Sequence, residues 1–137
     1  MSEFIFPIRV YYEDTDSGGV VYYANYLKFM ERARTEYLRS LGFEQDEIIA
    51  NEGVLFAVRS ITVDYLKSAR FNQLLNVSAH LAEIGKASLL FAQRVELASS
   101  NASILCTGQV KIACLDARTL RPTAIPPRIF REVTSER

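Results

Sequence analysis

The chain has 137 residues, of which 49% are apolar, and its 16 basic residues balance its 16 acidic ones. This length suits one domain over residues 1–137, and the composition is that of a folded protein. The charge balance argues against a nucleic-acid-binding protein that relies on bulk positive charge. The N-terminus has no basic flank before an apolar run, and no apolar stretch reaches about 18 residues. We therefore expect neither a signal peptide nor a membrane span, and a cytoplasmic location.

The two cysteines are expected to be reduced core residues. Cys106 and Cys114 lie eight residues apart in one predicted strand. A strand rises about 3.3 Å per residue, so the two sulfur atoms are too far apart for a disulfide. Two cysteines alone also do not make a metal site.

The first elements change from strand periodicity to helix periodicity. Residues 4–12 alternate between apolar and polar positions, which predicts a half-buried strand, and a proline inside it favours an edge or a bulge. Over residues 25–41 apolar residues recur every three to four positions, which predicts an amphipathic helix. Asn25 is the expected N-cap and Gly42 the expected C-terminal stop. A shorter helix is expected over residues 44–52.

The rest of the chain is predicted to be mostly strand. Four segments have alternating apolar positions, namely 54–66, 72–84, 87–97 and 103–116. Short polar turns indicate that neighbouring strands are antiparallel. A proline-broken tail then begins one or two helical turns. One amphipathic helix packed on such a sheet gives an α+β fold. Because one helix covers only one face, we expect self-association to protect the outer face or the sheet edges.

Three carboxylates crowd into four residues just before the predicted turn. Glu13, Asp14 and Asp16 are followed at once by two glycines, an apolar run and the predicted helix. Aspartate is common in turns, so spacing alone favours a turn or capping role. The alternative is a catalytic carboxylate beside a helix N-terminus, where unpaired N–H groups and the helix dipole stabilise negative charge. The residue types and their spacing leave both interpretations open.

The segment "VYYEDTDSGGVVYYANYLKFMERARTEYLRSLGF" resembles the N-terminal signature of hotdog-fold acyl-CoA thioesterases of the 4-hydroxybenzoyl-CoA thioesterase (4HBT) superfamily. The chain is most similar to the YbgC-like branch of small bacterial proteins associated with the Tol–Pal system. The likeness continues through "FAVRSITVDYLKSARFNQLL", "GKASLLFAQRV" and "CLDARTLRPTAIP", and so covers essentially the whole chain. It implies a hotdog fold, in which a five- to six-stranded antiparallel sheet wraps one long central helix and subunits pair edge to edge.

The resemblance places the family's catalytic carboxylate on Asp16. This group would attack the thioester carbonyl as a nucleophile or act as a general base on water. The backbone N–H around Tyr23, at the helix start, is the implied oxyanion donor, and Gly19 shapes the turn. The thiolate of coenzyme A is a good leaving group, so we expect no metal and no cofactor, coenzyme A being part of the substrate.

Position 23 is where the chain departs from the YbgC-like branch. Those proteins usually read V-Y-H-A-N-Y, whereas this chain reads V-Y-Y-A-N-Y. A backbone role survives this exchange. A side-chain acid–base role of the histidine does not, because a tyrosine phenol titrates near pH 10. A hotdog hydratase or dehydratase needs an Asp–His type of pair, so Tyr23 also counts against that alternative.

The remaining candidate residues are expected to bind the substrate or to be plain surface groups. For the phosphates of coenzyme A the candidates are Arg59, Lys67, Arg70 and Lys86, with Ser88 as a hydroxyl contact. For the lining of an apolar acyl tunnel they are Val21, Phe29, Phe56 and Val58. Glu31 is a second candidate acid, although a solvated or ion-paired helix face explains it as well. His80 is expected to be exposed or at an interface rather than to act as a base.

Taken together, these observations predict a cytoplasmic, homo-oligomeric acyl-CoA thioesterase. Its substrates would be short-chain aliphatic or aroyl-CoA thioesters, hydrolysed to the free acid and coenzyme A at a site shared between two subunits of a homodimer or homotetramer. The alternative outside catalysis is a scaffold that binds acyl carrier protein in phospholipid synthesis or envelope maintenance and has weak activity.

Overall fold

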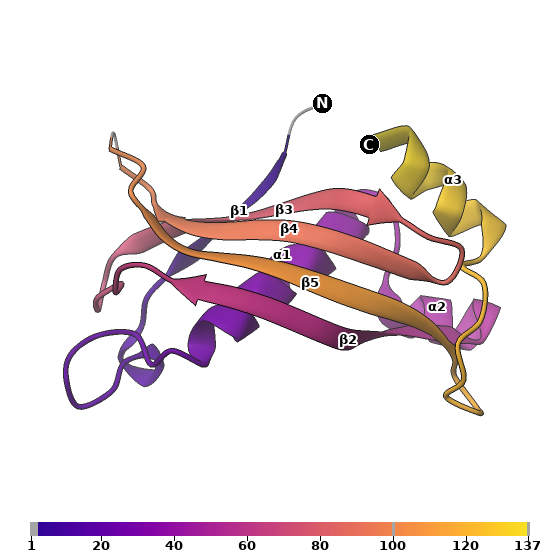
Figure 1. The fold of residues 1–137 in the computed structure, drawn as a ribbon, viewed down its shortest axis with the longest axis horizontal. Coiled ribbons are helices and arrows are strands. Elements are labelled where there is room, and N and C mark those ends of the chain that lie inside the picture. Colours follow the sequence, from indigo (N-terminus) through magenta and orange to yellow (C-terminus); the bar gives the residue numbers. More distant parts are fainter. Residues whose placement is uncertain (1–2, 100, 137) are drawn as a thin grey trace.

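The computed structural model describes residues 3–99 and 101–136 of the chain (Figure 1). In chain order the elements are β1 (Phe4–Arg9), a short 3-10 helix η1 (Tyr12–Asp14), α1 (Asn25–Ser40), α2 (Gln45–Glu52), β2 (Val54–Tyr65), β3 (Leu74–Ile84), β4 (Ser88–Leu97), β5 (Ile104–Asp116) and α3 (Pro127–Glu136). The predicted α+β class is confirmed. None of the helices within the described residues is long and apolar enough to cross a membrane.

The five strands form one antiparallel sheet in the order β1-β3-β4-β5-β2, which leaves β1 and β2 at its edges. The four strands predicted after residue 53 are confirmed to within a few residues at each end. The edge position expected from Pro7 is also confirmed. The first strand, however, ends at Arg9 instead of reaching residue 12. The Asp14 carboxylate accepts a hydrogen bond from the N–H of Tyr11 at 2.8 Å and stabilises the 3-10 turn that follows.

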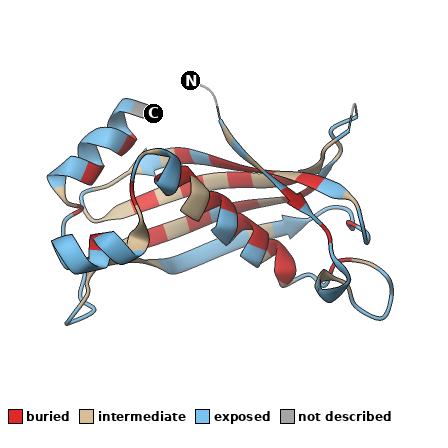
Figure 2. Cartoon of the chain, turned by 180° about the vertical axis from the view of Figure 1, so that it is seen from behind, coloured by how far each residue is buried: buried red, intermediate tan, exposed pale blue. Residues whose placement is uncertain are grey.

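Helix α1 lies along one face of the sheet, where it packs against β1, β3 and β4 (Figure 2). It is the predicted amphipathic helix and ends at Ser40, before Gly42, whose φ is 94°. Its buried stripe reaches the sheet through large side chains, among which Phe29 and Met30 have no exposed surface. The facing positions of β3, which are Leu75, Val77, Ala79 and Leu81, are all buried as their alternation predicts. The core therefore lies between α1 and the inner face of the sheet.

Two further helices cover the end of the molecule away from the start of α1 (Figure 1). The predicted short helix is α2, and α3 has ten residues, which is longer than the one or two turns expected. Two fully buried side chains, Ile129 and Val133, hold α3 in place. The guanidinium of Arg128 lies 4.9 Å from the ring centroid of Phe43 and forms an ion pair with Glu52.

Both cysteines are free and buried, as expected from the sequence. Burial raises the pKa of each thiol to about 11. Both side chains are therefore protonated, unreactive parts of the core near neutral pH.

Among the glycines, Gly108 of β5 is the one that packs against helix α1. A Cβ atom there would lie 3.0 Å from both Sδ and Cε of Met30, which is itself fully buried. We expect Gly108→Leu to lower the free energy of unfolding by about 1–3 kcal/mol, the usual cost of overpacking a core. Thr107→Leu, which adds the same side chain one position earlier, is the control and should cost less. Urea denaturation of both variants measures this, and equal costs would show that the contact with Met30 is not the constraint.

Candidate active site

The loop between η1 and α1 folds back on itself as a tight hairpin. Thr15 and Val21 form an isolated antiparallel bridge, and the N–H of Asp16 donates to the carbonyl of Val20 at 2.9 Å. Gly19 closes the turn by donating its N–H to the carbonyl of Asp16 at 3.0 Å. Its φ is 80°, in the left-handed region that glycine adopts without the strain of a Cβ atom. The hairpin thus presents Asp16 at the start of its turn.

The carboxylate of Asp16 is exposed and held from one side only. Its Oδ1 accepts a hydrogen bond from the N–H of Gly18 at 2.8 Å. Within residues 3–99 and 101–136 its Oδ2 has no hydrogen-bond or ion-pair partner. The group is therefore oriented by the turn and keeps one oxygen available to a reacting atom.

Helix α1 begins with unpaired N–H groups a few residues after this carboxylate. The first bonds of the helical turn run from the N–H of Asn25 to the carbonyl of Tyr22 and from the N–H of Tyr26 to that of Tyr23. In the described part of the chain the N–H groups of Tyr23 and Ala24 have no acceptor. No side chain caps the helix at Ala24. These N–H groups and the helix dipole form a site suited to a developing oxyanion.

Asn25 is not the N-cap predicted from the sequence but the first residue of α1. Its side chain reaches the hairpin instead, where Nδ2 donates to the carbonyl of Asp14 at 2.8 Å. The same carbonyl accepts the N–H of Tyr22 at 2.9 Å. The buried hydroxyl of Tyr26 accepts the N–H of Ala69 at 2.9 Å, which ties α1 to the β2–β3 connection. Sequence reasoning missed both contacts, because it assigned Asn25 to the N-cap. The signal for the second contact was a tyrosine on the apolar side of the helix, whose hydroxyl needs a partner when it is buried.

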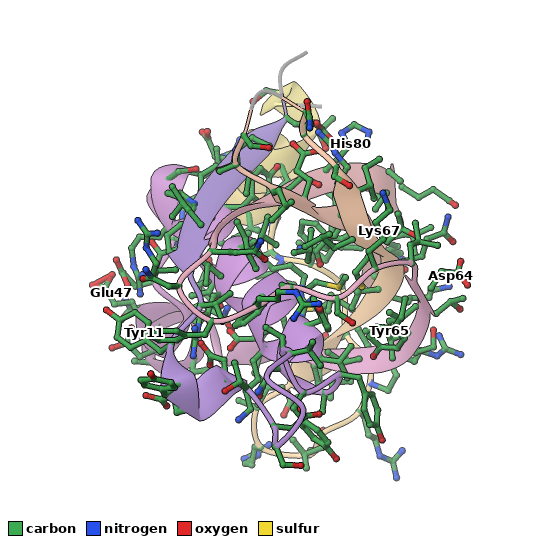
Figure 3. All side chains as sticks on the ribbon, turned by 90° about the vertical axis from the view of Figure 1, so that its left-hand side faces the viewer. Tyr11, Glu47, Asp64, Tyr65, Lys67 and His80 are labelled. Carbon is green, nitrogen blue, oxygen red and sulfur yellow. The ribbon has the colours of Figure 1, made fainter. Side chains whose placement is uncertain are left out.

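Tyrosine side chains surround the start of α1. The exposed ring of Tyr23 meets Tyr65 edge-on at 5.8 Å between centroids and lies 4.9 Å from Tyr22. Figure 3 views this end of the molecule and labels Tyr65 at the end of β2. Charge on the neighbouring Tyr23 phenol, and to a smaller degree that of Asp16, raises the pKa of Tyr22, and burial raises the pKa of Tyr65. Tyr22 and Tyr65 are therefore neutral near pH 7 and offer hydrogen bonds, not bases.

The residues predicted to line the acyl tunnel fall into two groups. Val21 and Phe29 belong to the buried core. Phe56 and Val58 line a cavity of about 100 Å³ between α1 and the sheet. Of these four predicted residues, the two on β2 are therefore the ones that a ligand could reach in one chain.

The predicted basic cluster is spread over three parts of the chain, namely the β2–β3 connection, the middle of β2 and the β3–β4 turn. Lys67 and Arg70 lie at the end of the molecule that carries Asp16. The ammonium group of Lys67 donates to the hydroxyl of Ser103 at 3.1 Å. The backbone of Arg70 forms an isolated antiparallel bridge with that of Val20 in the hairpin. Arg59 sits at a bulge in β2 and lines a second cavity of about 470 Å³ together with Ser88. Lys86 lines a third one, beside α3. In a single chain these side chains do not converge on Asp16.

His80 and Glu31 take the positions expected of surface groups. His80 is exposed on β3 (Figure 3). Glu31 is exposed on α1, and its carboxylate accepts a hydrogen bond from the hydroxyl of Thr35.

Comparisons with known proteins identify the family of the chain. Residues 18–103 match the family model of the thioesterase superfamily, 4HBT. The chain is 44% identical to the acyl-CoA thioesterase YbgC of Haemophilus influenzae, over 92% of this chain and 90% of that protein. It is 43% identical to the acyl-CoA thioester hydrolase YbgC of Escherichia coli, over 94% of each chain. The crystal structure of a probable thioesterase from Bartonella henselae is 32% identical, with a TM-score of 0.84 over 91% of this chain and all of that one (100%).

The chain therefore belongs to the 4HBT thioesterase superfamily. Within it, the chain is a homologue of the YbgC thioesterases, which it matches over most of its length.

The turn that presents Asp16 gives a test of the hairpin. Gly19→Ala forces an L-residue into the left-handed region, at a cost of about 1–2 kcal/mol, although a Cβ atom there would touch nothing within 4 Å. The control is Gly18→Ala, because the backbone of Gly18 is not left-handed. Its Cβ would instead lie 3.2 Å from Oδ1 of Asp16. We expect amide hydrogen exchange in the hairpin to speed up about tenfold in Gly19→Ala only, and equal rates in the two variants would contradict the assigned turn.

Proposed function

We propose that this protein hydrolyses acyl-CoA thioesters, with Asp16 as nucleophile or general base and the N–H groups at the start of α1 as oxyanion donors. The observation that carries the proposal is the hairpin itself. It holds a carboxylate with one unpaired oxygen a few residues before the unpaired N–H groups of Tyr23 and Ala24. Family membership supplies the reaction class, and the relatives named above are acyl-CoA thioesterases.

Either role of Asp16 gives a balanced reaction. As nucleophile, a carboxylate oxygen forms a bond to the acyl carbon and the C–S bond breaks, so that coenzyme A leaves as a thiolate and water then hydrolyses the mixed anhydride. As general base, the carboxylate takes a proton from the water that attacks the same carbon; the C–S bond then breaks, and the proton passes to the departing thiolate of coenzyme A. In both cases negative charge develops on the acyl oxygen, and the backbone N–H of Tyr23 stabilises it.

The tyrosine at position 23 supports a mechanism that relies on the backbone there. Its ring is exposed and packs edge-on against Tyr65. Tyrosine lacks the imidazole group that could supply a base near neutral pH. We therefore propose that the backbone N–H of Tyr23 stabilises the oxyanion and that its ring forms part of the wall of the site. Gly19 shapes the turn.

A site shared between two subunits explains why the candidate residues are divided. Strand β2 is a sheet edge and carries exposed apolar side chains, namely Val58, Ile61 and Tyr65. Antiparallel pairing of β2 with a second copy would bring the Val54 end of one strand to the Tyr65 end of the other. Arg59, at the middle of β2, would then lie at the seam between the two chains, and the first half of one β2 would lie near Tyr65 and Tyr23 of the other. We propose a homodimer of this kind as the smallest active unit.

Asp16→Asn tests the chemistry. The amide keeps the size of the side chain and the hydrogen bond to Gly18 but has neither the nucleophilic oxygen nor the basicity of a carboxylate. We expect kcat for short acyl-CoA and aroyl-CoA substrates to fall by about 10²–10⁴. Thiol release from coenzyme A, followed with a thiol-reactive dye over a substrate panel, measures it.

The matched control is Glu13→Gln, which removes an equally exposed carboxylate three residues earlier. It should keep near-wild-type activity. Near-full activity of a folded Asp16→Asn variant on the best substrate would show that the mechanism is wrong.

Ile61→Lys tests the shared site. Ile61 on the β2 edge is 38% exposed and Ile5 on the β1 edge is 39% exposed, so Ile5→Lys is a control with the same chemistry on the opposite edge. A lysine inside a paired edge leaves a buried charge, so Ile61→Lys should give monomers in analytical ultracentrifugation and lose activity. Dissociation by Ile5→Lys instead, or active monomers of Ile61→Lys, would contradict pairing through β2.

A further inference from the structure

The cavity of about 100 Å³ between α1 and strands β2, β4 and β5 has a polar end that the thioesterase chemistry does not use. Its mouth lies between the exposed side chains of Glu31 and Val58. Its walls are formed by buried apolar side chains, those of Leu38, Leu89 and Ile112. Arg34 of α1 provides the polar end. We call this cavity the Arg34 pocket.

Arg34 is a buried cation without an anionic partner. Only 8% of the residue is exposed, and within the described residues no carboxylate lies within ion-pair distance of its guanidinium. Burial lowers its pKa, which the charge of Glu31 partly opposes. Arginine is almost never fully buried unless it is paired, because removing its charge from water costs several kcal/mol. An anion bound beside it would offset that cost.

The guanidinium is held in place from its far side. Nη1 donates to Oε1 of Gln93 at 2.9 Å. Gln93 is itself fixed, because its Nε2 donates to the carbonyls of Met30 at 3.1 Å and Ser78 at 3.0 Å. This network leaves the other N–H groups of the guanidinium without a partner among the described residues. Among those residues, every side-chain nitrogen or oxygen that is fully buried has a hydrogen-bond partner. The guanidinium nitrogens of Arg34 that have no partner are therefore not fully buried, and the pocket that Arg34 lines is the surface they reach.

Glu31 does not fill this role. It lies at the exposed mouth, and its carboxylate accepts the hydroxyl of Thr35, which in turn accepts Nε2 of Gln45 at 3.3 Å. Water therefore screens its charge more than that of the buried guanidinium. The pocket accordingly has an apolar body, a cation fixed at its inner end and an opening to solvent.

We propose that the Arg34 pocket binds a small organic carboxylate, paired with the free N–H groups of Arg34 and with its hydrocarbon part against Leu38, Leu89 and Ile112. The volume is that of roughly three water molecules in liquid water, and a protein cavity of about 150 Å³ is known to accept benzene. Short aliphatic acids such as butyrate fit better than aromatic ones. The carboxylate has two sources: the acid that hydrolysis releases, or the distal carboxylate of a dicarboxylic acyl group. Both sources rest on the proposed function, whereas the binding of a free carboxylate does not.

Binding to the unmodified protein is the first test, because it needs neither activity nor a variant. Butyrate and butyramide have the same size, but only butyrate is an anion. We expect butyrate to shift the methyl NMR signals of Leu38, Leu89 and Ile112 and to bind about tenfold or more tightly than butyramide, as for hydrogen bonds to charged groups. Equal affinity of the two, or shifts confined to other methyl groups, would overturn the proposal.

Two arginine variants then test the assignment to Arg34. Arg34→Met keeps a long apolar side chain in the buried position and should lose the preference for butyrate over butyramide. Arg32→Met removes an exposed arginine two residues earlier on the same helix, where its guanidinium lies 5.9 Å from the ring of Phe29, and should keep that preference. Retained preference in folded Arg34→Met would overturn the proposal. Should that variant not fold, the butyrate and butyramide comparison on the unmodified protein decides.

The two sources of the carboxylate are separated by kinetics. If the pocket holds a distal carboxylate, glutaryl-CoA should have a KM about tenfold below that of valeryl-CoA, and Arg34→Met should remove the difference. If it holds the released acid, the two substrates should behave alike and butyrate should inhibit the unmodified protein more than Arg34→Met. Absence of hydrolysis by the unmodified protein, with its preference for butyrate over butyramide intact, would count against the proposed function and not against this pocket.

Discussion

The carbonyl oxygen of Asp14 accepts two hydrogen bonds, from the N–H of Tyr22 and from Nδ2 of Asn25, and the geometry of the site depends on this pair. Each bond contributes roughly 1 kcal/mol, and Asn25 is buried, so breaking its bond would also leave a desolvated amide unsatisfied. The pair fixes the base of the hairpin to the first turn of α1. A carboxylate at Asp16 and a helix start at Tyr23 are useful together only if neither moves relative to the other.

The packing of α1 extends this constraint to the whole fold. The helix is held on the sheet by its buried stripe, and the close approach at Gly108 sets how deeply it lies. The hydroxyl of Tyr26, from the same stripe, then fixes the connection that pairs with the hairpin through Ala69 and Arg70. Core packing and site geometry therefore depend on each other. Tyr26 belongs to the buried stripe, and its hydroxyl also fixes the β2–β3 connection that pairs with the hairpin.

Periodicity predicted α1 and the last four strands because burial on one face imposes it directly on the residue order. The prediction from periodicity failed where a local hydrogen bond determines the backbone conformation. The first strand stops early because Asp14 stabilises a 3-10 turn, and Asn25 lies inside α1 because its amide bonds to the hairpin. The basic candidates were judged by charge alone, and charge does not say at which end of a strand a side chain lies. The carboxylate and the glycine turn came from a family resemblance, which spacing alone could not have replaced.

The open β2 edge and a buried charge are two features that contacts among the described residues leave unbalanced. The β2 edge exposes unpaired backbone groups and apolar side chains, and Arg34 holds a largely buried cation without an ion-pair partner among the described residues. Both lie along the same side of α1, since Phe56 and Val58 of β2 also line the Arg34 pocket. A second copy paired along β2 would close the edge and would also narrow the mouth of the pocket at Val58. The effective dielectric around Arg34 would then fall, and the attraction of its guanidinium for a carboxylate would rise with assembly.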